Sequence, residues 1–513
     1  MTLFVMLNLL QHLHHQPIFM AVTAHQFTKP VSFLLLWLLI ILGIFLRVDR
    51  GDRFPVYQND DGLFYTWAGL SMLENFSSPT SLSVFETNNP FLIWRSQYMP
   101  FEPVQEFGFR IVRPWFDLPP LGTLLISLPA YALGYRGFSQ IPHLIVRLPA
   151  FVASVFTLLG TYLLGKSLFG RASARWALIF FAVWPLAVFS HRQSYLENIL
   201  TPFILLALWA FYRLYALRST FTLSGTEGLY ATNVRRWLWR LVLLCVMIAG
   251  WIKIPGFGLS LVIAYWLLAK KDWFRLKQLF TVTLISFGLY LIYGHLIGGP
   301  AFWQTLTNQA GRGAYLTSWF YMLTTPDVFG PIRDGWWLLG WLALLWVGSR
   351  PGKANRFLLI NTILWMVVIF VTSGRENTSP WYRYPLFPFL MIALGEVVRE
   401  FWHSVTQTRA VSQTGFIWAV LFFLFGLTGW ELAGFTVGSN VLRFGIVIVI
   451  AVFFTSLVSN HRVNRLISQL VAASLIGLML LGNIAAVRRY PFLRCPPGEC
   501  LEPTKLSIPF SIE

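Results

Sequence analysis

Long apolar runs separated by short polar segments recur along almost the whole chain. Many of these runs approach the length of about 20 residues that a helix needs to cross a hydrocarbon core of about 30 Å. They are continuous, whereas a transmembrane β-strand shows short stretches of alternating apolar and polar residues. The pattern therefore predicts an all-α polytopic membrane protein with about 13 transmembrane helices. To within a few residues at each end, we expect these helices at 31–46, 145–165, 174–190, 198–216, 237–252, 254–269, 278–297, 335–348, 357–372, 384–398, 415–431, 441–459 and 466–484.

The composition supports the same class of protein. Of 513 residues, 56% are hydrophobic and only 12% are charged, which lies far outside the range of soluble domains. The net charge of +18 would suit a nucleic-acid partner, but the basic residues gather in short clusters between apolar runs. Such clusters are typical of cytoplasmic loops, so we expect no nucleic-acid partner.

These basic clusters also predict the orientation in the membrane. A cytoplasmic N-terminus places the clusters at 166–175, 213–240, 270–277, 350–356 and 462–465 on the cytoplasmic side. Most acidic residues then face outward, and nine of them lie between Asp49 and Asp117. The long first outer loop is therefore the expected working surface.

The apolar run from Leu118 to Gly134 needs a separate decision, because a further span there would invert all later loops. We expect an interfacial or re-entrant helix that begins at Pro119 and Pro120, where a missing N–H is tolerated. The expected organisation is a cytoplasmic tail (1–30), a first transmembrane helix (31–46), a first extracytoplasmic loop with juxtamembrane helices (47–144), a transmembrane core (145–398), C-terminal transmembrane helices (399–484) and an extracytoplasmic tail (485–513).

Two acidic positions stand out on the expected outer face. Asp60 and Asp61 lie side by side in the first outer loop, and Glu197 lies in the short turn after the third apolar run. Carboxylates at the edge of a membrane are costly to desolvate unless they bind a cation, hold a substrate or accept a proton. A solvated turn is the alternative for the aspartates, and a structural ion pair with Arg192 is the alternative for Glu197.

Cations are expected on the same face. Lys253 lies in a tight apolar turn, where it needs an anionic partner or a water-filled cavity. Arg383 is flanked by Tyr382 and Tyr384, an arrangement that suits either a lipid phosphate or simple anchoring of a helix at the interface. Together, the outer carboxylates and cations suit an anionic lipid substrate and a nucleophile that must lose a proton. Phosphate-binding loops of the Walker type, Gly-x-Ser-x-Gly elbows and His-Glu-x-x-His motifs are absent from the sequence.

Four segments resemble motifs of the GT-C membrane glycosyltransferases, in particular the bacterial relatives of protein O-mannosyltransferases and of the lipid A aminoarabinose transferase. The segment from Asp60 to Ala68 resembles the Asp-Glu-x-x-x-Tyr motif, and Asp117 to Leu121 resembles the His-Pro-Pro-Leu motif. The run from 147 to 198 is similar to the second acidic block, and 382–388 resembles the Arg-Tyr-x-x-Pro-x-x-Pro segment. Asp61 replaces Glu, Leu118 replaces His, and Glu197 replaces the more common Asp.

The resemblance implies a GT-C fold and transfer of a sugar from a polyprenyl phosphate to an acceptor hydroxyl on a protein, lipid or glycan. It implies that Asp60 is the general base, that inversion occurs at the anomeric carbon, and that the site faces outward, in a prokaryotic plasma membrane. No cofactor is required, although Mg²⁺ or Mn²⁺ bound by the three carboxylates is an alternative. The expected site comprises Asp60, Asp61 and Glu197 as catalytic residues, Arg192, Lys253 and Arg383 at the donor phosphate, and Tyr65, Asp117 and Tyr382 as further substrate contacts.

Two other functions remain open at this stage. A transporter or flippase of an anionic lipid would use the same outer charges without chemistry, but it should carry ionisable residues near the middle of its spans. Here almost every charge lies at a helix end or in a loop. A non-catalytic scaffold descended from such an enzyme would be expected to lose Asp60 and Glu197, and both are present.

Overall fold

The computed structural model describes residues 29–51, 54–55, 61–75, 79–83, 90–95, 108–137, 139, 141–220, 226–311, 335–372, 380–406, 413–458 and 462–494. Asp60 therefore lies outside the described residues. The chain divides into two compact units, residues 1–39 and residues 40–513. The described part of the first unit is helical, and the second unit contains all of the candidate site.

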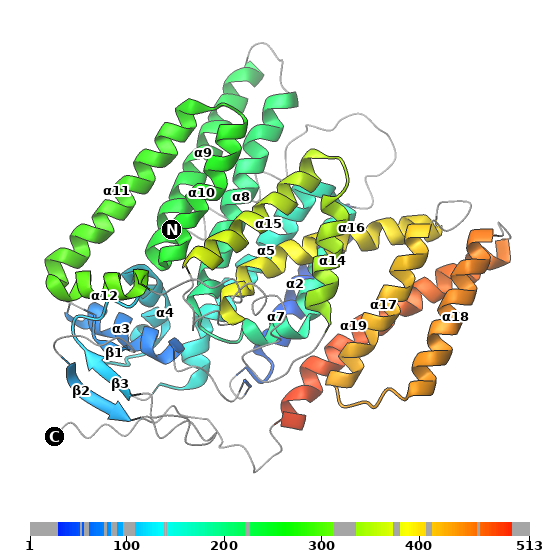
Figure 1. Cartoon of the computed structure of the whole chain (residues 1–513), viewed down its shortest axis with the longest axis horizontal. Helices are drawn as coiled ribbons and strands as arrows, with labels where there is room; N and C mark the ends of the chain where they lie inside the picture. Colours follow the sequence, from blue (N-terminus) through cyan, green and yellow to red (C-terminus); the bar gives the residue numbers. More distant parts are fainter. Residues whose placement is uncertain are drawn as a thin grey trace. The chain divides into compact units, whose positions relative to one another are not determined.

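Every apolar run in the expected set coincides with a helix or with two consecutive helices (Figure 1). Among the described residues, six helices are long and apolar enough to cross a membrane. The predicted polytopic helical membrane fold is confirmed. The helices are α2 (Lys29–Val48), α5 (His143–Phe169), α6 (Arg171–Val183), α7 (Pro185–Ser190), α8 (Leu196–Thr220), α9 (Thr226–Ile252), η2 (Ile254–Phe257), α10 (Gly258–Ala269), α11 (Trp273–Gly298), α14 (Trp336–Gly348), α15 (Lys353–Thr372), η3 (Pro380–Leu386), α16 (Phe387–Thr406), α17 (Gln413–Leu432), α18 (Ser439–Val458) and α19 (Arg462–Arg494).

The run expected as one span at 174–190 is interrupted. Helix α6 ends at Val183, and α7 begins at Pro185 after the extended residue Trp184. Proline lacks the N–H that would continue the hydrogen-bond ladder, and it is favoured in the first turn of a new helix. The break therefore has a local cause in the sequence.

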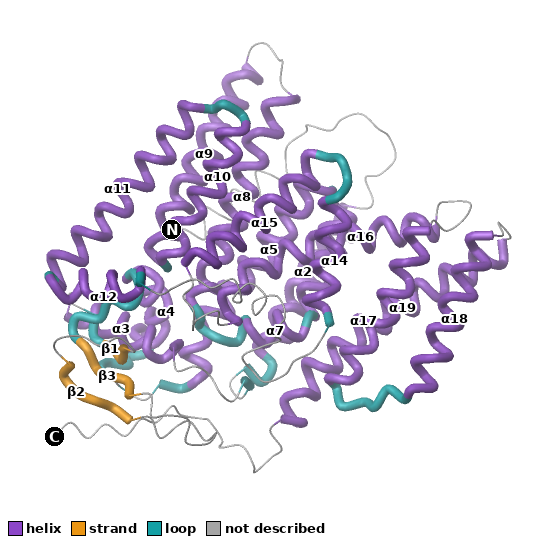
Figure 2. The backbone as a smooth tube through the Cα atoms, in the orientation of Figure 1, coloured by secondary structure: helices purple, strands orange, loops and turns teal. Residues whose placement is uncertain are grey.

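The segment expected as the first outer loop, 47–144, contains two helices, α3 (Asp61–Asn75) and α4 (Pro120–Ala132). Helix α4 starts at the expected proline pair and has 13 residues, so it is about 20 Å long and too short to cross a 30 Å core. The loop also contains a small antiparallel sheet, which the sequence analysis did not anticipate (Figure 2). Its strands are β1 (Ser81–Ser83), β2 (Pro90–Arg95) and β3 (Gly108–Val112), in the order β1-β3-β2.

Close backbone contacts fix α3 and α4 against the membrane helices. A Cβ atom added to Gly69 of α3 would lie 2.3 Å from both Ser127 Oγ and the carbonyl oxygen of Thr123 in α4. A Cβ atom added to Gly122 of α4 would lie 2.5 Å from Leu196 Cδ2 and 2.7 Å from the carbonyl oxygen of Ile252. Leu196 and Ile252 are the immediate neighbours of Glu197 and Lys253. Helix α4 thus joins α3 to the residues expected in the site.

Candidate active site

The central feature of the site is an ion pair between Lys253 and Glu197. Lys253 Nζ lies 2.5 Å from Glu197 Oε1, and the two residues are only 5% and 3% exposed. Glu197 lies in the first turn of α8, and Lys253 connects α9 to η2. Burial is the largest single effect and lowers the pKa of Lys253, but Glu197, Tyr382 and Asp61 together outweigh it and raise this pKa above its ordinary value. Glu197 is thus the anionic partner that the apolar surroundings of Lys253 required.

Asp61 is the first residue of α3, next to this pair. Tyr65, one turn later, donates a hydrogen bond from its hydroxyl to Asp61 Oδ2 at 3.2 Å. Burial raises the pKa of Asp61 to about 6, and the charge of Glu197 adds to this effect, while Lys253 and the Tyr65 hydroxyl oppose it. Asp61 therefore titrates in the same electrostatic environment as Glu197 and Lys253.

Tyr382 covers the ammonium of Lys253. Its ring centroid lies 4.2 Å from Lys253 Nζ, a distance at which a cation interacts favourably with an aromatic face. The preceding residue, Trp381, stacks on Tyr195 at 5.0 Å with nearly parallel rings. This stacking fixes η3 against the start of α8. Four segments, the first turns of α3 and α8, the connection after α9, and η3, thus meet around Lys253.

The neighbouring Arg383 has different surroundings. Its guanidinium is buried and lies over the ring of Trp337 in α14, 5.2 Å from the centroid. Tyr384, on its other side in the sequence, packs against Tyr195 at 6.0 Å. The expected role of Arg383 at the donor phosphate stays a prediction.

Arg192 does not form the ion pair with Glu197 that the sequence offered as an alternative; the partner of Glu197 is Lys253. Arg192 is buried and donates hydrogen bonds to the backbone carbonyls of Leu46 and Asp49, both at 2.8 Å, and to that of Phe54 at 3.4 Å. Three carbonyls of the segment before Asp60 therefore hold this guanidinium. These contacts show that Arg192 positions the segment before Asp60, and its expected role at the donor phosphate stays a prediction.

Arg147 in the second turn of α5 has the same role, which the sequence analysis missed. It donates hydrogen bonds to the carbonyls of Gly51 and, at 2.7 Å, Pro55. Its side chain is only 1% exposed. An arginine inside an otherwise apolar helix is costly without such partners, and this was the available signal in the sequence.

Arg47 at the end of α2 completes this set of buried arginines. It donates hydrogen bonds to the carbonyls of Phe181 and Ala182, both at 3.0 Å, and to Nδ1 of His191 at 3.0 Å. The carbonyl of Phe181 has no N–H partner one turn later, because that residue is Pro185. Arg47 thus satisfies the end of α6 and connects it to the turn before α8.

Asp117 lies at the entrance to α4, beside α12 (Pro300–Ala310). Its backbone carbonyl accepts a hydrogen bond from the side-chain amide of Gln309. The preceding residue, Phe116, packs against Phe302 with ring centroids 5.3 Å apart. The expected role of Asp117 as a substrate contact stays a prediction.

A metal centre would need several side chains that can bind a metal close together. Within the described ranges, no group of three His, Cys, Asp or Glu side chains comes close enough to hold a metal ion. The cation next to Glu197 is the ammonium of Lys253. In chemical terms, the site combines carboxylates that can accept a proton with a buried cation that can stabilise an anion.

The chain has the expected GT-C fold. The chain is similar in structure to ArnT from Cupriavidus metallidurans bound to undecaprenyl phosphate, with a TM-score of 0.55 and 16% identity over 91% of this chain and 78% of that one. The apo form of the same protein gives a TM-score of 0.53 and 14% identity over 90% of this chain and 78% of that one. At these identities the similarity is one of fold.

A sequence relative is the Bacillus subtilis (strain 168) protein named "Putative mannosyltransferase YkcB". It is 28% identical over 181 residues, which are 35% of this chain and 20% of the relative. The match thus spans about a fifth of the length of that relative. No family model matches the chain.

Proposed function

We propose that this protein transfers a sugar from a polyprenyl-phosphate donor to an acceptor hydroxyl at the outer face of a prokaryotic plasma membrane. The observation that carries the proposal is the buried Lys253–Glu197 pair, with Asp61 beside it and Tyr382 over the ammonium. A site of this kind can neutralise a lipid phosphate where little water is present to do so. The similarity in fold to a protein bound to undecaprenyl phosphate supports a donor of this class.

In the proposed reaction, the acceptor oxygen attacks the anomeric carbon of the donor sugar. The new carbon–oxygen bond forms as the bond from that carbon to the phosphate oxygen breaks, and the bonding electrons leave with the polyprenyl phosphate. The proton of the acceptor hydroxyl passes to Asp60, the general base implied by the first-loop motif. A single displacement of this type inverts the anomeric centre.

The remaining residues stabilise charge and hold the substrates. Lys253 and Arg383 stabilise the departing phosphate, a contribution typically worth about 10²- to 10³-fold in rate for one well-placed donor. Asp61 remains ionised beside Asp60, and its negative charge favours transfer of the acceptor proton to Asp60. Glu197 holds Lys253 in place, and Tyr65 and Tyr382 shape the pocket around the sugar.

We further propose that Lys253 takes the place of a metal ion at Glu197. A divalent cation held by Asp60, Asp61 and Glu197 would have to displace an ammonium that already forms a short ion pair. Removal of divalent cations should therefore leave transfer unchanged. A complete loss of transfer with a chelator, restored by Mg²⁺ or Mn²⁺, would favour the metal-bound arrangement.

The test is transfer of radiolabelled sugar from polyprenyl-phosphate donors, mannose first, into acceptors in membranes that contain the full-length protein. Asp60→Asn should lower transfer by about 10²- to 10⁴-fold, the usual contribution of a general base. Movement of labelled lipid across the bilayer is measured in the same membranes. If labelled lipid moved across the bilayer but no sugar transfer depended on Asp60, the transferase proposal would be wrong and a flippase function would be supported.

A further inference from the structure

Three basic side chains lie near one another at the ends of three helices. Lys166 lies in the last turn of α5, Arg171 is the first residue of α6, and Arg213 lies in α8. We call these three residues the basic cluster. Lys166 and Arg171 are exposed and Arg213 is half-buried, so a solute or a lipid head group can reach all three side chains.

The basic cluster is separate from the candidate active site. Arg213 follows Glu197 by 16 residues on α8, which is about 24 Å along the helix axis. In the expected topology, this end of α8 faces the cytoplasm. A ligand of the basic cluster is therefore not the donor phosphate proposed at Lys253.

The packing of α5 against α8 brings Lys166 and Arg213 to the same level. The turn that precedes α8 donates a side-chain hydrogen bond to the first turn of α5, and a Cβ atom added to Gly160 would lie 3.0 Å from Leu205 Cβ. The two helices therefore run side by side in the same direction. Lys166 lies six residues beyond Gly160, a rise of about 9 Å, and Arg213 lies eight residues beyond Leu205, a rise of about 12 Å.

The three charges of the basic cluster repel one another. Those of Arg171 and Arg213 both act on the ammonium of Lys166. Among the described residues, none of the three side chains has an ion-pair or hydrogen-bond partner. Like charges held together in this way are costly unless an anion lies between them.

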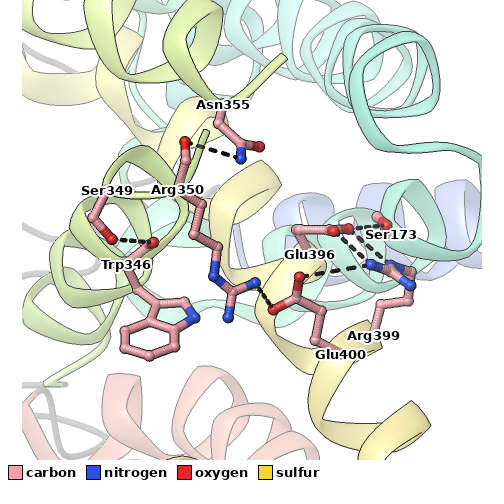
Figure 3. Close-up of polar contacts among 8 residues, drawn as sticks. All are labelled: Ser173, Trp346, Ser349, Arg350, Asn355, Glu396, Arg399 and Glu400. Atoms are coloured by element: carbon pink, nitrogen blue, oxygen red, sulfur yellow. Dashed lines mark hydrogen bonds and ion pairs between the residues drawn. The ribbon is translucent and has the colours of Figure 1, made fainter. Parts of the chain in front are cut away.

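The carboxylates of the neighbouring helix α16 have other partners (Figure 3). Ser173, two residues after Arg171, donates a hydrogen bond to Glu396 Oε2 at 2.5 Å. Glu396 also accepts hydrogen bonds from Arg399 at 2.6 and 2.9 Å. Glu400, one turn further along α16, pairs with an arginine that follows α14. Both carboxylates thus neutralise other arginines and leave Arg171 without a counter-charge.

The carboxylate near the α8 end of the cluster is engaged as well. Asp272 accepts a hydrogen bond from the hydroxyl of Tyr215, two residues after Arg213, at 2.8 Å. It also forms an ion pair with Arg275 at 2.6 Å. Arg213 therefore lies close to an acidic residue whose charge is already neutralised.

We propose that Lys166, Arg171 and Arg213 together bind a phosphate group, supplied by an anionic phospholipid or by a soluble phosphate compound. The phosphate oxygens accept hydrogen bonds from the two guanidinium groups and from the ammonium. The planar fork of an arginine matches phosphate oxygens well, and a lysine adds a compact charge. The bound anion offsets the repulsion within the basic cluster and joins the ends of α5, α6 and α8. The proposal does not depend on sugar transfer.

Thermal unfolding of the purified full-length protein in detergent tests the proposal. Phosphatidylglycerol is compared with diacylglycerol of identical acyl chains, and inorganic phosphate is compared with chloride at equal ionic strength. At least one phosphate ligand should raise the thermal midpoint of wild type above its phosphate-free counterpart, because a ligand that binds the folded state stabilises it. A rise with phosphatidylglycerol alone supports a lipid head group as the ligand, and a rise with inorganic phosphate supports a soluble one.

The dependence of the midpoint on ligand concentration gives an apparent affinity for wild type and variants. Arg171→Gln should weaken this affinity about fivefold, and Lys166→Gln/Arg171→Gln/Arg213→Gln should weaken it about 100-fold, as expected for one and three charges near a phosphate. Without a phosphate ligand, the triple variant should unfold at the wild-type temperature or above it, because the repulsion is gone. Arg171→Gln changes one exposed residue, so it provides the test even if the triple variant fails to fold.

The matched control is Arg236→Gln/Lys277→Gln/Arg356→Gln. It removes the same total charge from exposed positions of α9, α11 and α15, and it should keep the wild-type affinity. Equal losses of affinity in the two triple variants would mean that phosphate is attracted by the overall charge only, and would overturn the proposal. A wild-type midpoint that neither phosphate ligand raises above its counterpart would also overturn it.

Discussion

The ammonium of Lys253 and the carboxylate of Glu197 are 2.5 Å apart, although the residues are 56 positions apart in the chain. Both are buried at the ends of neighbouring helices, α8 and α9. A buried ion pair is costly to form, and loss of one partner leaves the other charge without compensation. A substitution of either residue should therefore change both the stability of the fold and the charge of the site.

Glu197→Gln should lower the free energy of unfolding by about 3–5 kcal/mol, because Lys253 loses its counter-charge in a buried position. The unfolding of the purified protein in detergent measures this change. Glu400→Gln is the control, since its ion pair with Arg350 is partly exposed and should cost less than about 1 kcal/mol. If both variants lost the same free energy of unfolding, burial would not explain the contribution of the Lys253–Glu197 pair.

Transfer should depend on the ionisation of Asp61. The pKa of Asp61 is about 6, so activity should rise as the pH increases through this value and the carboxylate forms. Tyr65→Phe removes a hydrogen bond that favours the ionised form, so it should move the inflection to higher pH. An unchanged pH profile in Tyr65→Phe would exclude Asp61 as the titrating group.

Ionisation of Asp61 should lower the stability of the fold, although it raises the activity. Its pKa is higher in the folded protein than in the unfolded chain, so the folded state binds more protons between about pH 4 and pH 6. Its contribution to stability is therefore present at acid pH and is lost as the pH rises through about 6. Asp61→Asn should accordingly unfold at a higher temperature than wild type at pH 7.5 while transferring less sugar.

Gly122→Ala should disturb the site without changing a charged residue. The new methyl group would overlap Leu196 and the carbonyl of Ile252, which would push α4 away from Glu197 and Lys253. We expect at least a tenfold loss of transfer and about 1–3 kcal/mol lower stability, the usual cost of overpacking. Gly288→Ala in α11 is the control, because no atom lies within 4 Å of its added Cβ. Wild-type transfer by Gly122→Ala would show that this contact does not position the site.

Arg192→Lys should preserve charge but lose the hydrogen bonds of the guanidinium. A single ammonium cannot reach the carbonyls of Leu46, Asp49 and Phe54 together, and each buried carbonyl left unpaired costs about 1–3 kcal/mol. The thermal midpoint and the turnover number should both fall, while the apparent affinity for the donor should change little. Arg136→Lys, at an exposed turn, is the control. A large loss of donor affinity with unchanged stability would instead support the expected contact of Arg192 with the donor phosphate.

The positions of the membrane helices could be predicted because length and apolarity are local properties of each run. The break at Trp184 and Pro185 also had a local signal, although the expected span at 174–190 ignored it. The small sheet could not be foreseen, because its strands are short and β3 pairs with β1 from 25 or more positions earlier in the chain. Pairing of this kind depends on the packed structure.

The candidate site also combines features that the sequence could predict with features that only the fold reveals. Lys253 and Glu197 were each selected because a charge in apolar surroundings needs a partner, but only the packing of α8 against α9 makes them partners of each other. The roles of Arg47 and Arg147 were missed because their acceptors are backbone carbonyls, which every residue carries. The sequence pattern identifies charges that need partners, and the fold decides which partners they have.

The most direct test of the account is sugar transfer by the double variant Lys253→Met/Glu197→Gln, compared with wild type and with Gly288→Ala. Removal of both charges avoids the unpaired ammonium that Glu197→Gln leaves, so this variant should regain most of the stability that Glu197→Gln loses. It should nevertheless transfer sugar at least about 100-fold more slowly, because the cation that stabilises the departing phosphate is gone. Wild-type transfer by a stable double variant would contradict the proposal that this ion pair is the centre of the active site.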